Sequence, residues 1–198
     1  MNKKIKSINA RHILDSRANP TIEVEVTTSD NIIGRAAVPS GASTGALEAH
    51  ELRDNDSFFN GMGVNKAIEN VKTIISDSLV GMDVTDQGSI DDMLIEIDGT
   101  DNKNNLGANA ILAVSMATMR ASANQQNKQL FELFPNIYGP SSLPIPFMNI
   151  LNGGAHADNS VDIQEFMIVP FGFETFDTSL KAGVEISVSY THLRAHET

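Results

Sequence analysis

The sequence predicts an α+β domain, built from a three-stranded antiparallel sheet with helices, followed by the beginning of a second, α/β unit. Strict alternation of apolar and polar residues near the N-terminus is typical of half-buried strands. From Gly63 onwards the apolar residues recur instead at the spacing of one helical face. Residues 135–146 contain four prolines, a composition typical of a linker. We therefore expect two structural units joined by this proline-rich stretch.

The first unit is expected to begin with three strands, at residues 4–11, 21–27 and 32–38. Residues 21–27 read Thr-Ile-Glu-Val-Glu-Val-Thr, which places the apolar side chains on one face of a strand. Ser29, Asp30 and Asn31 supply the residue types of a tight turn, so the second and third strands are predicted to form a hairpin.

Three helices are expected to follow. Apolar residues at helical spacing predict the first over residues 64–79, with Gly81 as its stop signal. The second is expected over residues 90–97, with Asp83, Thr85 or Asp86 as its cap. The third, over residues 108–124, is rich in alanine, and residues 130–134 close the unit. Ile111, Leu112, Ser115, Met116 and Met119 are expected to lie on one side of it.

The second unit is expected to contain two short buried strands, at residues 147–151 and 166–169, and a helix over residues 175–186. We place the two domains at residues 1–138 and 143–186. Residues 187–198 do not continue the pattern and are expected to be a divergent tail without a function. His192 and His196 in this tail have the i,i+4 spacing of a metal site, but we expect no ligand role for them.

Composition excludes several classes of function. The chain has 14 basic and 25 acidic residues and a formal charge of −11, which argues against nucleic acid as a partner. It has no cysteine, so disulfides and thiolate chemistry are excluded, and this fits a reducing cytoplasm. The basic N-terminus lacks the apolar core of a signal peptide, and no apolar window is long enough to cross a bilayer.

The first candidate functional segment is glycine-rich and follows the third predicted strand. Residues 38–45 read Val-Pro-Ser-Gly-Ala-Ser-Thr-Gly. Small residues at the end of a strand can fold over an anion, because their backbone N–H groups and hydroxyls replace water around it. The alternative is an ordinary solvent loop, which is the commoner structure for an isolated run of this kind.

The second candidate segment combines a paired glycine with two possible proton carriers. His156 follows Gly153 and Gly154, and Glu165 stands nine residues later beside the amide of Gln164. Paired glycines allow a positive φ and a close approach of the backbone to a ligand. Burial of Glu165 in an apolar run would favour its protonated form and allow proton sharing.

Each of these residues also has a structural alternative. A lone histidine is more often a hydrogen-bonded structural residue than a catalytic one. Asp158 fits an Asx-turn that stabilises the same loop, and we favour that role for it. Glu165 fits a strand-end carboxylate paired with a lysine.

Both segments, together with residues 15–21 (Asp-Ser-Arg-Ala-Asn-Pro-Thr) and 106–112 (Leu-Gly-Ala-Asn-Ala-Ile-Leu), resemble enolase. Enolase is the glycolytic lyase that interconverts 2-phosphoglycerate and phosphoenolpyruvate. The resemblance runs from about Ile5 to Ile186, and residues 156–165 resemble bacterial members most. It implies an enolase N-terminal α+β domain followed by the start of a TIM-like barrel, truncated in this chain.

The resemblance also implies roles for individual residues. The loop at 38–45 would be a lid in which Ala42 and Ser43 contact the substrate and Ser43 ligates the second magnesium ion. His156 would contact the substrate and support proton transfer, Gln164 would hold the substrate through its amide, and Glu165 would lie beside it. The expected catalytic residues are therefore His156 and Glu165, and the expected cofactor is Mg²⁺.

Other parts of the enolase machinery have no counterpart in this sequence. In whole members, the catalytic lysine, the proton-donating glutamate and the carboxylates of the first magnesium ion lie in later barrel strands. We therefore expect the 198-residue chain to be inactive by itself. The implied ligands are 2-phosphoglycerate and phosphoenolpyruvate, and the full-length protein is expected to form a homodimer or a larger homo-oligomer.

Three positions depart from the family pattern. Ala18 replaces a glycine after Asp15, Ser16 and Arg17, a segment that packs at the subunit contact in the family. Met62 replaces a lysine and Ala155 replaces a glutamate.

Two alternative functions remain open from the sequence. The first is a non-enzymatic binding module derived from enolase, at the cell surface or secreted as in some bacteria. The second is another lyase or isomerase of the wider superfamily, against which the lid sequence and the His156 turn both argue.

Overall fold

The structure is a computed structural model that describes residues 3–38, 41, 45–134, 142–154, 158 and 160–196, with the backbone alone for 192–196. The chain separates into two compact units, Met1–Pro135 and Asn136–Thr198. Each unit is described by itself. No helix among the described residues is both long and apolar enough to span a membrane.

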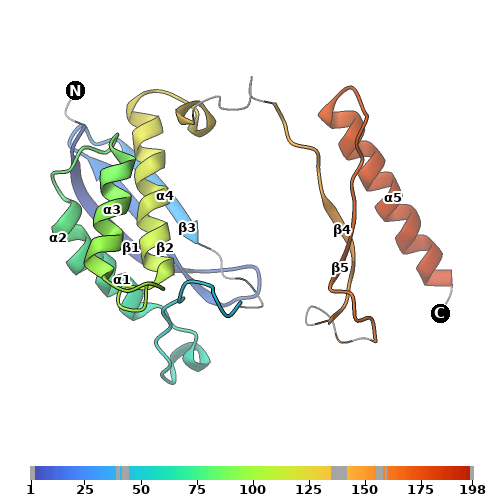
Figure 1. The fold of residues 1–198 in the computed structure, drawn as a ribbon, viewed down its shortest axis with the longest axis horizontal. Helices are drawn as coiled ribbons and strands as arrows, with labels where there is room; N and C mark the ends of the chain where they lie inside the picture. Colours follow the sequence, from blue (N-terminus) through green and yellow to red (C-terminus); the bar gives the residue numbers. More distant parts are fainter. Residues whose placement is uncertain are drawn as a thin grey trace. The chain divides into compact units, whose positions relative to one another are not determined.

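The first unit is built on a three-stranded antiparallel sheet in the order β1-β2-β3 (Figure 1). The strands are β1 (Ile5–Leu14), β2 (Pro20–Thr28) and β3 (Ile33–Val38). The three predicted strands and the hairpin are thus confirmed, and β1 is three residues longer at its end than expected. One face of the sheet is buried, and its apolar side chains include Ile8, Ile22, Val24, Val26 and Ala36.

The opposite face of the sheet carries a ladder of charge. Arg11 pairs across the strands with Glu23, with its Nη2 2.5 Å from Oε1. Arg35 likewise faces Glu25, with Nη2 2.9 Å from Oε2, and this hydrogen bond raises the pKa of Arg35 above its usual value. Alternation in β2 therefore separates an apolar core face from a solvated, ion-paired face.

The first long helical segment covers residues 65–79 and contains a π-turn that the sequence did not predict. The segment consists of α1 (Asn65–Asn70), the π-turn η2 (Val71–Ile75) and α2 (Ser76–Leu79). A short 3₁₀ turn, η1 (Phe58–Gly61), precedes it. Ile74, one of the apolar residues at helical spacing in this segment, is 48% exposed. Gly81 follows with φ 93°, in agreement with the predicted stop.

Two longer helices, α3 (Gln87–Asp98) and α4 (Ala108–Gln125), complete the layer over the sheet (Figure 1). Asp86 caps α3 by accepting a hydrogen bond from the Ser89 amide at 3.3 Å, so the predicted cap is confirmed. After α4, the 3₁₀ turn η3 (Leu130–Leu133) closes the unit.

Of the residues expected together on one side of α4, Ile111 and Met116 pack against the core and Leu112 does not. Leu112 is 48% exposed, and the side chains that pack on the sheet are small ones, including Ala110, Ala113, Ala117 and Ala121. A Cβ at Gly34 in β3 would overlap the backbone of Ala121 and Ala117. The helix lies so close to β3 that only small residues fit between them, and Leu112 faces away.

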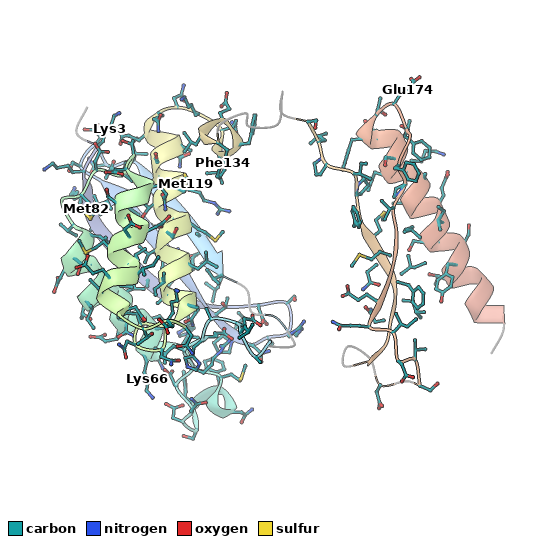
Figure 2. The ribbon with its side chains drawn as sticks, in the orientation of Figure 1. Lys3, Lys66, Met82, Met119, Phe134 and Glu174 are labelled. Atoms are coloured by element: carbon teal, nitrogen blue, oxygen red, sulfur yellow. The ribbon has the colours of Figure 1, made fainter. Side chains whose placement is uncertain are left out.

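The second unit contains two antiparallel strands, β4 (Met148–Asn152) and β5 (Glu165–Ile168), and one helix, α5 (Phe176–His196). The expected burial of the strands is wrong, since Phe166 is 42% and Met167 is 47% exposed. The helix ends ten residues later than expected and runs through most of the stretch that we took for a divergent tail. Figure 2 shows the described side chains of both units. None of the described large apolar side chains of this unit belongs to the buried core.

Candidate functional site

A hollow of about 560 Å³ in the first unit lies beside the glycine-rich segment. Gly41 and Gly45, the two described residues of that segment's glycine-rich run, line it together with the end of β3 and the start of α4. Its other lining residues are Val38, Glu48, Ala49, His50, Glu51, Ala108, Asn109 and Leu112. The predicted anion-binding segment therefore borders a concave surface in the described structure.

The carboxylate of Glu48 is hydrogen-bonded to Gly45, the last residue of the glycine-rich segment. The Gly45 amide donates to Glu48 Oε2 at 2.8 Å, and the Glu48 amide donates to the Gly45 carbonyl at 3.1 Å. A backbone N–H group at the rim of the hollow thus already bonds to a negatively charged group. This is the kind of partner that a phosphate or carboxylate ligand would also supply.

The wall of the hollow at residues 50–52 is held by the loop that precedes α4. The His50 amide donates to the Asn102 carbonyl at 2.7 Å, and the Ala108 amide donates to the His50 carbonyl at 2.8 Å. The side chain of Asn109 bonds to both backbone groups of Leu52, at 3.1 Å each. Two segments far apart in the sequence are therefore paired almost as strands are.

Arg53, which follows this wall in the sequence, holds it through a buried side chain. The Arg53 guanidinium donates to the carbonyls of Pro20 and Met62, both at 2.6 Å, and to Glu51 Oε1 at 2.6 Å. Its side chain is 10% exposed, while its Nε is buried without a hydrogen-bond partner among the described residues. Arg53 thus links β2, the turn before α1 and the wall of the hollow.

The turn at Asp15 is fixed by backbone donors. Its carboxylate accepts hydrogen bonds from the amides of Asn19 at 2.9 Å and Arg17 at 2.8 Å, and these lower the pKa of Asp15. The turn needs a left-handed residue, and Ala18 supplies it with φ 61°. The alanine that replaces the expected glycine therefore carries its Cβ in a conformation that glycine adopts without strain.

In the second unit, the paired glycines lie against the segment that carries the predicted amide and carboxylate. The Gly153 amide donates to the Gln164 carbonyl at 2.9 Å, and the Gly154 amide donates to the Val161 carbonyl at 2.7 Å. Gly154 has φ 55°, and a Cβ at Gly153 would collide with the Ile163 carbonyl at 2.5 Å. The structure thus confirms that this turn requires glycine for close backbone approach.

The predicted site residues are only partly within the described structure. Gln164 and Glu165 are both exposed, and Glu165 pairs with Asn152 in the register of β4 and β5. The burial expected for Glu165 is therefore wrong, since its side chain lies on an exposed position of β5. The other predicted residues, Ala42, Ser43 and His156, lie outside the described residues.

Asp158 is described as part of a bend and is exposed. His192 and His196 lie one turn apart on the backbone of α5, and their side chains lie outside the described part.

The described residues do not form a seat for magnesium. Mg²⁺ prefers six oxygen ligands in octahedral geometry. Within the part of the chain that the structure describes, no group of three or more histidine, aspartate or glutamate side chains could hold a metal ion. Ser43, which the resemblance assigns to a magnesium ion, is not among these residues, so no step of a reaction can be derived through a metal here.

Comparison with protein families decides the family. Residues 5–134 match the model of the enolase N-terminal domain, and residues 140–197 match the model of the enolase C-terminal TIM barrel domain. The chain belongs to the enolase family. The second match includes residues 187–197, most of the stretch that we expected to be a divergent tail.

The enolase matches agree with the fold of both units. The three-stranded sheet with its helices is the N-terminal domain, and β4, β5 and α5 are the start of the barrel domain. A complete TIM barrel has eight strands and typically about 250 residues, so this part of the chain holds only its opening.

Sequence reasoning missed the residues that hold the wall of the hollow in place. Asn109 lies in one of the quoted motifs, but nothing in its local sequence shows that it bonds to a backbone 57 positions earlier. Arg53 was overlooked because arginine is usually exposed. The only local signal for either residue is that it is polar and stands among apolar or turn-forming residues.

Proposed function

We propose that this chain carries the substrate-side part of an enolase that dehydrates 2-phosphoglycerate reversibly to phosphoenolpyruvate with Mg²⁺. The observation that carries the proposal is the order of the two family matches, 5–134 and 140–197, across nearly the whole chain. The same two units contain the glycine-rich lid sequence and the paired-glycine turn before His156.

In this proposal the residues of the chain bind and orient the substrate. Backbone N–H groups of residues 38–45 and the hydroxyl of Ser43 would face the anion, and Ser43 would contribute to a magnesium ion. His156 would hydrogen-bond to the substrate and support proton transfer, Gln164 would hold it through its amide, and Glu165 would lie beside it. Bound Mg²⁺ stabilises negative charge that develops on carboxylate oxygens.

The base that removes the carbon-bound proton would come from outside this chain, since the resemblance assigns it to a later barrel strand. We therefore propose that the chain binds substrate more readily than it converts it. The proposed location is the cytoplasm, with the cell surface as a second location, and the proposed assembly of the full-length protein is a homodimer or a larger homo-oligomer.

Ligand binding tests the proposal directly. Backbone NMR spectra of the chain are recorded during titration with 2-phosphoglycerate in the presence of Mg²⁺. We expect shifts at Gly153, Gly154 and Gln164, because these backbone groups hold the turn that carries His156. Glycerol phosphate, which lacks the carboxylate, is the matched control ligand and is expected to bind more weakly.

Two variants sharpen the binding test. His156→Gln is expected to lower the affinity for 2-phosphoglycerate by about tenfold, the usual effect of losing a hydrogen bond to a charged group. Asp158→Asn, in the same loop, is expected to leave the affinity within about twofold, since an asparagine also forms an Asx-turn. Equal binding of both ligands, or equal effects of both variants, would contradict the proposal. A coupled assay of the chain for phosphoenolpyruvate is expected to stay at background.

A further inference from the structure

We propose that Asn109 is a positioning residue that sets the wall His50–Leu52 of the hollow against the start of α4. This goes beyond the family matches, which assign no role to it. The proposal rests on the proposed function only in taking the hollow beside the glycine-rich segment as the place where a ligand binds.

The side chain of Asn109 makes the two hydrogen bonds that the backbone of a neighbouring strand would make. Its Oδ1 accepts from the Leu52 amide and its Nδ2 donates to the Leu52 carbonyl, each at 3.1 Å. The residue is 3% exposed, so both bonds lie away from competing water. Leu52 therefore has its two backbone groups satisfied by one amide side chain.

The usual role of a polar residue in the first turn of a helix does not explain Asn109. Gly107 occupies the N-cap position of α4, and it has no side-chain cap. The amide of Asn109 turns away from its own helix and bonds to a segment 57 residues earlier. The missing side chain at Gly107 leaves space for the contact between Asn109 and Leu52. A Cβ at Gly107 would come within 2.6 Å of Asn109 Oδ1 and 2.5 Å of Leu52 Cβ.

The consequence concerns the side chains that line the hollow. Glu48, His50 and Glu51 all stand on the few residues before Leu52. Glu48 is also bonded to Gly45, but the backbone that carries His50 and Glu51 is held to α4 through Leu52, so the positions of these two residues depend on Asn109. The wall is thus held by the rigid helix layer, and a ligand would meet it already in place.

Amide hydrogen exchange tests this on the complete chain. Asn109→Leu removes both bonds to Leu52, and Asn109→Asp keeps the acceptor but loses the donor to the Leu52 carbonyl. We expect exchange of the Leu52 and His50 amides to rise by about tenfold or more in Asn109→Leu, and by less in Asn109→Asp. Urea unfolding of the first unit, measured in parallel, separates this local release from a general loss of stability.

Asn124 is the matched control. It lies on the same helix and its Nδ2 donates to a strand carbonyl, that of Ile33, at 2.7 Å. Asn124→Leu is expected to raise exchange near β3 and to leave Leu52 unchanged. Cleavage by a glutamyl endopeptidase after Glu51 is expected to accelerate in the Asn109 variants alone.

Three results would overturn the proposal. The first is unchanged exchange at Leu52 in Asn109→Leu. The second is a rise that is equal across all amides of the first unit and matches its loss of unfolding free energy. The third is an equal effect of Asn124→Leu at Leu52. None of these measurements uses a substrate, so failure of 2-phosphoglycerate to bind would leave the result on Asn109 interpretable.

Discussion

Gly34 in β3 lies directly against Ala121 in α4, so that a Cβ at position 34 would come within 2.7 Å of the Ala121 Cα and overlap its amide nitrogen. The carbonyls on the outer edge of the same strand are also occupied. Arg120 donates to the Arg35 carbonyl at 2.7 Å, and Asn124 donates to the Ile33 carbonyl at 2.7 Å. The helix thus covers the free edge of the sheet, where an unpaired strand would invite association.

The first prediction concerns this contact. Gly34→Ala is expected to destabilise the first unit by about 1–3 kcal/mol or more, because its Cβ meets backbone atoms, which cannot move aside as a flexible side chain can. Urea unfolding followed by circular dichroism measures the change. Gly88→Ala in α3 is the control, since a Cβ there meets nothing within 4 Å. That variant is expected to be neutral or to stabilise by up to about 1 kcal/mol, and equal losses in both variants would contradict the prediction.

The second prediction concerns pH and the buried carboxylate of Asp98. Burial disfavours its charged form, but hydrogen bonds from the Thr100 hydroxyl and from the amides of Leu106, Thr100 and Asn105 outweigh this and lower its pKa below the usual 3.8. The folded state therefore holds its proton less tightly than the unfolded state. The resulting stabilisation is fully present above about pH 4 and is lost as the pH falls through the folded-state pKa.

The variant Asp98→Asn makes this measurable. We expect a loss of about 1–3 kcal/mol near neutral pH, because the amide group turns a donor towards backbone donors, and a smaller difference from the unmodified chain at acid pH. Asp83 offers a matched control, since it also accepts from a threonine two residues later, and these bonds lower its pKa. Because Asp83 is exposed, the difference for Asp83→Asn is expected to be much smaller. A loss that stays constant with pH would contradict the prediction.

The features that the sequence predicted correctly are those encoded by neighbouring residues. Alternation in residues 21–27 predicted β2 and its buried face, and Asp86 was recognisable as a cap three residues before Ser89. Ala18 was expected to occupy a glycine position and does so with a positive φ. Each of these depends on a few consecutive positions and on local sterics.

The features that the sequence did not predict depend on distant residues. The buried side of α4 is set by Gly34, which allows an approach so close that alanines, and not Leu112, face the sheet. The pairing of Asn109 with Leu52 joins positions 57 apart. The exposure of Glu165 depends on which elements pack over β5, and a local sequence pattern does not show this.

The last prediction concerns the apolar surface of the second unit. Phe171 is 76%, Leu143 72% and Phe147 69% exposed, whereas the buried apolar core consists of residues of the first unit. Two strands and a helix without a core of their own add no separate cooperative unfolding transition. We therefore expect a single urea transition, and we expect residues 1–135 alone to reproduce its midpoint to within about 10–15%.

Dye binding measures the same surface. The 198-residue chain is expected to bind a hydrophobic dye and to associate as its concentration rises, because apolar side chains of this size gather on the strand pair and on the segments beside it. Residues 1–135 are expected to exclude the dye and to remain monodisperse in light scattering. The triple variant Phe171→Ser, Leu143→Ser and Phe147→Ser is expected to reduce both effects in the complete chain without moving the urea midpoint. A complete chain that excludes the dye and unfolds in two separate cooperative steps would show that the second unit forms a core of its own.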